Sequence, residues 1–394
     1  MQNGQIAHSL EQLYPKMVQW RRHLHQFPEL SFHESATAAW IAERLVAMGC
    51  EVVRDVGGNG VVAVIRGTEP GPVVALRADI DALPIQDEKT CEYTSKVAGV
   101  MHACGHDAHT ATLLAVADHY SRHRHAFRGE RRLLFQPAEE VTPGGAIGMI
   151  EDGALGGAEA IYGVHLWTPL PYGQAASRAG AFMSAADEFT IDIWGKGGHG
   201  GLPHEAVDAI FIGSAFVQAV QSIVSRSVNP VQPAVVTVGS FHAGTANNVI
   251  AESCQLKGTI RSFDEEERRR IHKLLEKLLE HTCEMYGATC QLDLRLGYPP
   301  VVNEQAEAAR FFKVAAELFG RDRAIASEPI TVAEDFAYYL QRLPGCFMFV
   351  GAGNPDTGAN YAHHHPRFDI DERAMVRSAR LLIAMAEDFA VFGR

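Results

Sequence analysis

The order of the expected helices and strands is the feature that most constrains how this chain can fold. Helical and apolar strand patterns alternate through the first part of the sequence, with glycine and other turn residues between them. The expected helices cover residues 35–48 and 106–119, and the expected strands cover 60–65, 73–76, 132–135 and 160–166. Because helices alternate with buried strands, this part indicates an α/β domain with a mainly parallel sheet.

A second pattern interrupts this alternation. Strands at 189–194, 234–241, 254–260 and 289–296 and helices at 205–225 and 264–286 give the order β-α-β-β-α-β. This order is typical of a ferredoxin-like, four-stranded sheet covered by two helices. The α/β alternation resumes after Pro300, and 394 residues are enough for two cores. We therefore predict a catalytic domain of residues 1–182 and 297–394, with an inserted domain of residues 183–296.

The net charge limits the kinds of partner that the protein can bind, and the cysteines indicate the cellular compartment in which it works. The formal net charge is −12, which argues against a surface that binds nucleic acid or an anionic membrane and leaves a small-molecule substrate. No run approaches the roughly 18 apolar residues that a membrane helix requires, and the first twenty residues lack the layout of a signal peptide. Seven cysteines are scattered without a CxxC pair, which favours a reducing compartment. We predict a cytoplasmic protein.

The densest chemical signal is MHACGHDAH at residues 101–109. Thiolate and imidazole ligands suit zinc and other late first-row metals. Cys104 and His106 are two residues apart, so an extended loop can direct both side chains to one point. A histidine-rich helix start with solvated side chains is the ordinary alternative, but this density favours metal binding. A competing ligand set is His102, His106 and His109, which would share a face if the helix began early.

The sequence QPAEE at residues 136–140 follows an apolar strand and carries two adjacent carboxylates. Glu139 and Glu140 repel each other unless a cation or a proton intervenes. A metal would resolve this conflict if one glutamate bound it and the other acted on water. Two solvated loop glutamates are the ordinary alternative, but open α/β sheets bind ligands beyond their strand ends, which favours a site here.

Further candidates lie near other strand ends. Asp79 and Asp81 face one way after the strand VVAL, where they would either bind metal or orient a ligating histidine; a loop-capping aspartate is an equal alternative. His165 ends an expected strand, where an isolated histidine is usually structural. Pro366 fixes an extended backbone before it, so at least one imidazole of residues 363–365 should be firmly held.

The inserted domain offers His199 between glycines, the loop GTANNVI with Asn248, and Arg261 on an expected strand. Arg261 could hold a carboxylate in bidentate fashion, although a solvated arginine is an equal alternative. The chain has no GxSxG, GxxxxGK[ST] or HExxH motif. A Cys104 nucleophile is conceivable, but it would leave the paired glutamates and His364 unexplained.

Eight motifs occur in the order seen in one enzyme family: RRHLHQFPELSFHE, RADIDALPI, MHACGHDAHT, QPAEE, GVHLW, GKGGHGGLPH, AEDFAYY and HHHPRFDIDE. From Trp20 to about Glu372 the chain resembles the aminoacylase, hippurate hydrolase and indole-acetyl-amino-acid hydrolase group of metallopeptidases. The resemblance implies a zinc-exopeptidase-like catalytic domain with two divalent metal ions per subunit. Zinc or manganese would be expected, with cobalt or nickel as further candidates. It also implies that the inserted domain is a lid and often a dimerisation surface, and hence a homo-oligomer, a dimer or a tetramer.

The resemblance also assigns roles. It implies that the metal ligands are Cys104, His106, Glu140, His165 and His364, that Glu139 is the general base, and that His199 and Asn248 act from the lid. Asp79 and Asp81 would support the ligands. Two departures from the family pattern are Ala251 after NVI, where proline is common, and residues 331–333, where glycines are common.

Together these features predict hydrolysis of an N-acyl amino acid to a carboxylic acid and a free amino acid by a metal-activated water. A dipeptidase or carboxypeptidase of the same chemistry is the alternative. A binding protein without turnover is disfavoured, because a dead relative would be expected to lose some of these ligands.

Overall fold

The computed structural model describes residues 3–393, and the chain divides into two compact units. Unit 1 contains the chain up to Gly180, Val302–Glu328 and the chain from Asp335 onward. Unit 2 contains Ala181–Val301 and Pro329–Glu334. This division differs from the predicted one because residues 181–182, residues 297–301 and the short segment Pro329–Glu334 belong to unit 2. The segment pairs there through the main chain, since Ser184 N donates to Ile330 O at 3.1 Å.

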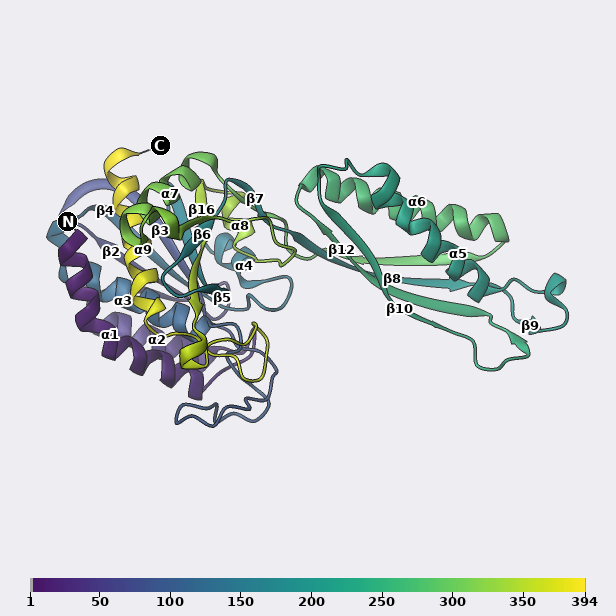
Figure 1. Cartoon of the computed structure of the whole chain (residues 1–394), viewed down its shortest axis with the longest axis horizontal. Helices are drawn as coiled ribbons and strands as arrows, with labels where there is room; N and C mark the ends of the chain where they lie inside the picture. The colour runs from purple at the N-terminus through teal and green to yellow at the C-terminus, as the bar shows by residue number, and fades with distance from the viewer. Residues whose placement is uncertain (1–2, 394) are drawn as a thin grey trace. The chain divides into compact units, whose positions relative to one another are not determined.

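Unit 1 is built on an eight-stranded sheet with the order β1-β2-β4-β3-β5-β16-β6-β15 (Figure 1). The strands are β1 (Glu51–Val56), β2 (Gly60–Arg66), β3 (Glu69–Asp79), β4 (Arg128–Gln136), β5 (Ala160–Pro171), β6 (Ala175–Ser177), β15 (Ala324–Ala326) and β16 (Gly345–Gly353). The central strands β4, β3, β5 and β16 are mutually parallel, whereas β1 and β2 join the edge antiparallel. The predicted mainly parallel sheet is confirmed for this central part.

Seven α-helices of unit 1 are α1 (Asn3–Gln26), α2 (Ser35–Ala47), α3 (His106–Arg122), α4 (Gly145–Glu151), α7 (Gln305–Phe319), α8 (Ala337–Leu340) and α9 (Ala374–Phe392). Helices α3 and α9 pack against the sheet, and α1 packs outside them. Because α3 has the sheet on one side and α1 on another, every residue from His106 to Tyr120 is buried. This buried helix begins at His106, which is a candidate metal ligand.

Unit 2 has a four-stranded antiparallel sheet with the order β10-β12-β8-β13. Its strands are β8 (Ala185–Trp194), β10 (Ala234–Ala243), β12 (Ser253–Ser262) and β13 (Thr289–Arg295). Helices α5 (Ala209–Ser222) and α6 (Glu265–Tyr286) lie along the sheet (Figure 1). The elements follow the predicted order β-α-β-β-α-β. Short strands β9 (Gly198–His199) and β11 (Val249–Ile250) form a separate two-stranded sheet. Strands β7 (Gly180–Met183) and β14 (Val301–Asn303) form another, where the chain passes between the units.

Helix α5 contradicts the prediction that no stretch of the chain approaches the length and apolar composition of a membrane helix. With the turn that follows it, the segment Ala209–Ser227 is long and apolar enough to cross a membrane by length and composition alone. One such helix is weak evidence, because core helices pass the same test. Here Ile212, Phe216 and Val220 are buried in the core of unit 2, whereas Ile210 and Phe211 on the same helix are exposed.

Candidate metal centre

Three neighbouring parallel strands carry candidate residues at one edge of the unit 1 sheet. Asp79 ends β3, and Glu139 and Glu140 follow the end of β4. His165 does not end its strand as predicted, because β5 continues to Pro171. The pairing of β3 with β5 nevertheless stops at Arg77 and Gly163, so His165 lies just beyond the last paired residue. The parallel register therefore brings side chains from three strands to one edge.

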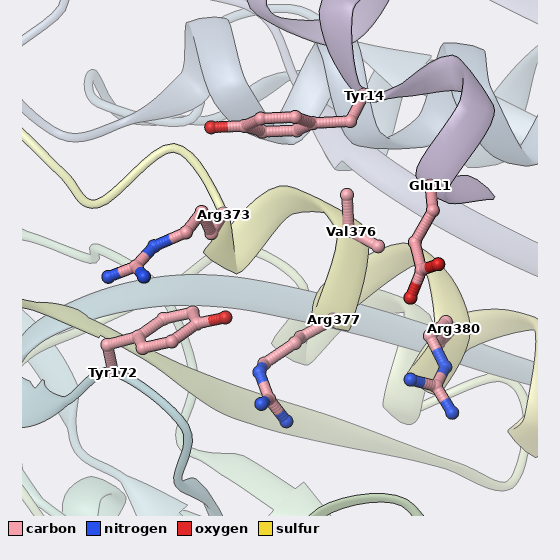
Figure 2. Close-up of a pocket in the computed structure, with 7 residues that line it drawn as sticks. All are labelled: Glu11, Tyr14, Tyr172, Arg373, Val376, Arg377 and Arg380. Carbon is pink, nitrogen blue, oxygen red and sulfur yellow. The ribbon is translucent and has the colours of Figure 1, made fainter. Parts of the chain in front are cut away.

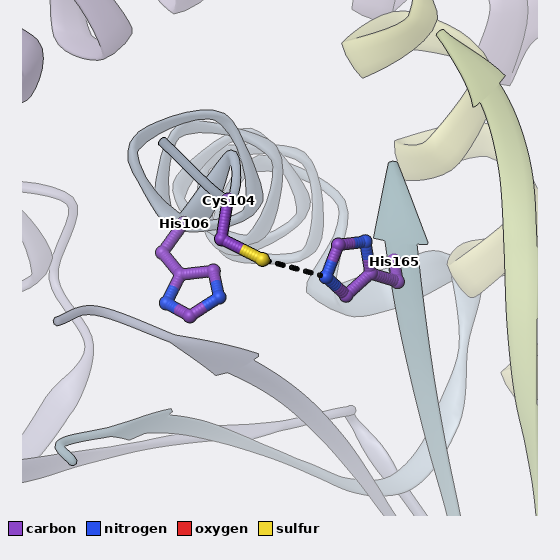
Figure 3. A group of neighbouring side chains, drawn as sticks. All are labelled: Cys104, His106 and His165. Atoms are coloured by element: carbon purple, nitrogen blue, oxygen red, sulfur yellow. Dashed lines mark hydrogen bonds between the residues drawn. The ribbon is translucent and has the colours of Figure 1, made fainter. Parts of the chain in front are cut away.

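A sharp turn places the next two candidates. Gly105, which lies between Cys104 and His106, has φ 95°. This is a left-handed backbone conformation that residues with a side chain rarely adopt. The turn lets Cys104 reach across to β5, where its Sγ lies 3.4 Å from His165 Nε2 (Figure 3). His106 starts α3 and is buried.

The five predicted ligands lie together in overlapping groups. Within each group the potential ligand atoms lie within 4.8 Å of one another, and the groups are Cys104, His106 and His165; Cys104, Glu140 and His364; and His106, Glu139 and Glu140. Glu140 Oε1 joins two of these groups, because it lies 3.4 Å from His364 Nε2 and 3.8 Å from His106 Nε2. Glu139 Oε2 lies 4.0 Å from the same His106 atom.

Two atoms of this cluster fit a bound cation. His106 Nε2 and Glu140 Oε1 are buried and have no hydrogen-bond partner among residues 3–393. A buried polar atom without a partner is costly, and a metal ion between the two would satisfy both. The thiol, imidazole and carboxylate donors also match the preferences of late first-row metals.

Asp81 orients two of the candidate ligands at once. Its carboxylate lies 3.0 Å from His106 Nδ1 and accepts a hydrogen bond from Glu140 N at 2.9 Å. Ser31 Oγ also donates to it at 2.7 Å. An imidazole that donates Nδ1–H to a carboxylate keeps a lone pair on Nε2, which is the form that binds metal. The structure thus gives Asp81 a supporting position.

Asp79 has a different partner. It lies 2.6 Å from His109 Nδ1 and accepts from Arg77 Nη1 at 2.7 Å. His109 Nε2 then accepts from Leu166 N at 2.9 Å, so both ring nitrogens are occupied. The alternative ligand set of His102, His106 and His109 is therefore not favoured. Asp79 and His109 instead tie α3 to the sheet.

The electrostatics of the cluster favour positive charge. Burial alone would lower the pKa of His106, but the carboxylates of Asp79, Asp81 and Glu140 raise it to about 10. Burial and the charges of Glu140 and Glu139 raise the pKa of the Cys104 thiol. Both shifts arise because the carboxylates create a strongly negative potential, which a divalent cation would neutralise.

Several residues that support the metal centre were not predicted from the sequence. His363 stacks on Trp167 with ring centroids 4.5 Å apart, and its Nδ1 lies 3.7 Å from Cys104 Sγ. His364 has φ 65°, so the chain turns sharply and adjacent imidazoles take different directions. Glu34 Oε1 accepts from Ala138 N at 2.8 Å and holds the loop before Glu139. The motif SFHE contained Glu34, but no local pattern indicated its distant partner.

The unit 2 candidates do not form one cluster. His199 pairs with Val249, and Gly200 N donates to Asn248 O at 2.8 Å, so His199 and Asn248 lie in neighbouring exposed loops. Arg261 pairs with Ala186, whereas the loops adjoin the other end of β12, where Ser253 pairs with Trp194. Arg261 comes eight positions after Ser253 along the strand, which corresponds to about 26 Å.

Comparisons with known proteins point to one family of hydrolases. The model for the family described as peptidase family M20/M25/M40 matches residues 75–388. YhaA of Bacillus subtilis, whose name describes an amidohydrolase, is 50% identical over 97% of this chain and 96% of its own length. An N-acyl-L-amino acid amidohydrolase of Geobacillus stearothermophilus is 45% identical over 77% of this chain and 82% of that protein. The crystal structure of YXEP from Bacillus subtilis, described as a dinuclear metal binding peptidase from the M20 family, has a TM-score of 0.84 and 33% identity, covering 97% of this chain and 99% of that one.

Proposed function

The chain belongs to peptidase family M20/M25/M40, and from this premise we propose that it is a metal-dependent hydrolase of N-acyl amino acids. The products would be a carboxylic acid and a free amino acid. The names of the Geobacillus relative and of YhaA support an amide substrate. The observation that carries the proposal is the buried cluster of thiol, imidazole and carboxylate groups, in which His106 Nε2 and Glu140 Oε1 have no hydrogen-bond partner among residues 3–393.

Two divalent metal ions would be bound by Cys104, His106, Glu140, His165 and His364. The ions would be zinc or manganese, with cobalt or nickel as further candidates. When bound, the ions would polarise a water molecule and the substrate carbonyl. Asp81 would hold Glu140 in place, because it accepts a hydrogen bond from the Glu140 N–H.

Glu139 would act as the general base. Glu139 is 7% exposed, and its carboxylate lies near the same His106 atom as that of Glu140. It would accept a proton from water as the water oxygen bonds to the amide carbon, and then give that proton to the nitrogen as the C–N bond breaks. His199 would stabilise the developing oxyanion.

Asn248 and Arg261 would hold the substrate carboxylate. Since about 26 Å of strand separates the ends of β12, a small substrate cannot touch both residues of one copy. If both residues take part, they come from different copies of the chain. This requirement supports a homo-oligomer, a dimer or a tetramer formed through unit 2. A cytoplasmic location fits seven cysteines that are all free thiols.

The substrate class is tested by hydrolysis rates on acetyl-amino acids, benzoyl-glycine and dipeptides, each with and without chelator. We expect the acyl-amino acids to be cleaved fastest and chelation to abolish the activity. Faster cleavage of dipeptides would favour the dipeptidase alternative. Activity that survives chelation but is lost on thiol alkylation would favour a Cys104 nucleophile.

The roles of the two glutamates are tested by Glu139→Gln. The variant should lose turnover by several orders of magnitude and keep the wild-type metal content, because the amide cannot accept the proton. The matched variant Glu140→Gln should lose metal as well. If Glu139→Gln loses metal and Glu140→Gln does not, the two roles are reversed.

A further inference from the structure

A second cavity lies in unit 1 and shares no residue with the metal centre. Its volume is about 320 Å³, and its walls come from α1, the segment after β5 and the start of α9 (Figure 2). The lining residues are Glu11, Tyr14, Tyr172, Arg373, Val376, Arg377 and Arg380. This volume falls within the range of small-molecule sites.

Three arginines point to the chemistry of a ligand. Arg373, Arg377 and Arg380 are spaced four and three residues apart, so they share one face of the helix. Arg373 is already paired, because its Nε donates to Asp371 Oδ1 at 2.9 Å. Among residues 3–393, neither Arg377 nor Arg380 has a carboxylate oxygen within 4.0 Å or a hydrogen bond from its guanidinium group.

The two unpaired guanidinium groups are only partly solvated. Both residues are half-buried, and Arg377 Nε is buried without a hydrogen-bond partner. Burial lowers the pKa of Arg380, and the charge of Arg377 lowers it further. Among the described residues that line the cavity, Glu11 is the one with a carboxylate, so the cavity keeps an excess of positive charge.

The Tyr172 ring contacts two of the three arginines. The guanidinium carbons of Arg373 and Arg377 lie 4.4 and 5.0 Å from the centre of the Tyr172 ring. Such cation–π contacts fix the planes of the groups and leave their N–H edges available. Tyr14 faces the cavity from α1, opposite Tyr172, and Val376 lies between them (Figure 2). The side toward Tyr14 is therefore apolar and flat.

We propose that this cavity binds a small organic oxyanion, whose carboxylate or phosphate group pairs with Arg377 and Arg380 while its apolar body lies against Tyr14 and Val376. Guanidinium groups match the geometry of carboxylate and phosphate oxygens, and a charged hydrogen bond is stronger in a half-buried site. The site is independent of the reaction at the metal centre.

The test is calorimetric titration of the metal-loaded protein with phenyl phosphate, benzoate, inorganic phosphate and neutral benzamide. The metal centre also attracts anions, so each probe is titrated into wild type, Arg377→Gln/Arg380→Gln and the control Arg321→Gln, which changes an exposed arginine elsewhere. We expect the double variant to weaken one binding event at least tenfold and the control to leave it unchanged. Glu11→Gln should tighten the same event several-fold, because it removes a carboxylate from the cavity.

Hydrolysis without probe should stay within twofold of wild type in all these variants. Arg377→Lys keeps the positive charge but loses the planar guanidinium group, so this variant should bind the anionic probes with intermediate affinity. It also serves as a control in case the double variant does not fold. A higher affinity for phenyl phosphate than for benzoate would identify a phosphate ligand, and the reverse order a carboxylate. The proposal is wrong if the double variant binds every probe as wild type does, if benzamide binds as tightly as benzoate, or if inorganic phosphate binds as tightly as phenyl phosphate.

Discussion

Asp81→Asn should weaken metal binding although Asp81 is not one of the proposed ligands. All three partners of the carboxylate donate to it: the Nδ1–H of His106 to one oxygen, and Ser31 Oγ and Glu140 N to the other. An asparagine has only one oxygen, so its NH₂ group must face a donor. If the NH₂ group faced Glu140 N, two hydrogen-bond donors would point at each other. A main-chain N–H is always a donor and cannot become an acceptor.

The less costly orientation turns the NH₂ group toward His106. The imidazole must then accept at Nδ1 and carry its proton on Nε2, which removes the lone pair from the atom that would bind metal. Loss of such an orienting group typically weakens metal binding 10–100-fold, or about 1.4–2.7 kcal/mol. We expect this loss for one of the two ions, because His106 is not part of the group formed by Cys104, Glu140 and His364.

The measurement is competition for metal against a chromophoric chelator at fixed pH, with the number of bound ions counted. Ser31→Ala is the matched control, because it removes one donor to the same carboxylate but leaves the His106 tautomer unchanged; its affinity should stay within about threefold of wild type. Wild-type affinity for both ions in Asp81→Asn would refute the tautomer argument. Equal losses in both variants would instead point to a general loosening of the loop.

Three further predictions concern stability. Gly105→Ala should lower the free energy of unfolding by about 1–2 kcal/mol and reduce metal content, because φ 95° is strained for alanine; unaltered thermal unfolding would contradict this. In unit 2, burial raises the pKa of Asp187, but Arg268 and His272 outweigh it and lower the value to about 2. This carboxylate should therefore contribute about 2 kcal/mol above pH 4 and lose it as the pH falls toward 2, and the difference between wild type and Asp187→Asn in denaturant unfolding should shrink over that range. Arg21→Met should cost about 3–5 kcal/mol, because Arg21 is 1% exposed and paired with three carboxylates; a calorimetric melting temperature near that of wild type would contradict it.

Much of the fold could be predicted because it follows from local periodicity. The strands around 60–65, 132–135 and 254–260 and the helices at 35–48 and 264–286 all lie within a few residues of the observed elements. The extension of β5 to Pro171 was not predictable, because its second half pairs with the distant β16 and not with β3. The same holds for Pro329–Glu334, which joins unit 2 from a separate part of the chain.

The candidate site could be predicted from the sequence only in part. The density of MHACGHDAH indicated Cys104 and His106, and the resemblance named His364 among three neighbouring histidines. Spacing alone could not make that choice, because it depends on the left-handed conformation of His364, a consequence of tertiary packing. The partners of His109 were equally hidden, since Asp79 and Leu166 lie far from it in the sequence.

The proposed ligands also have a consequence for how unit 1 is held together. Cys104, Glu140 and His165 precede unit 2 in the chain, whereas His364 follows it. Ions shared by these residues would act as a removable cross-link that closes a chain loop containing the whole of unit 2. Such a cross-link stabilises the folded state chiefly by reducing the entropy of the unfolded chain, and longer loops give larger effects. Chelation should therefore lower the melting temperature of unit 1 much more than that of unit 2, so that one cooperative transition separates into two.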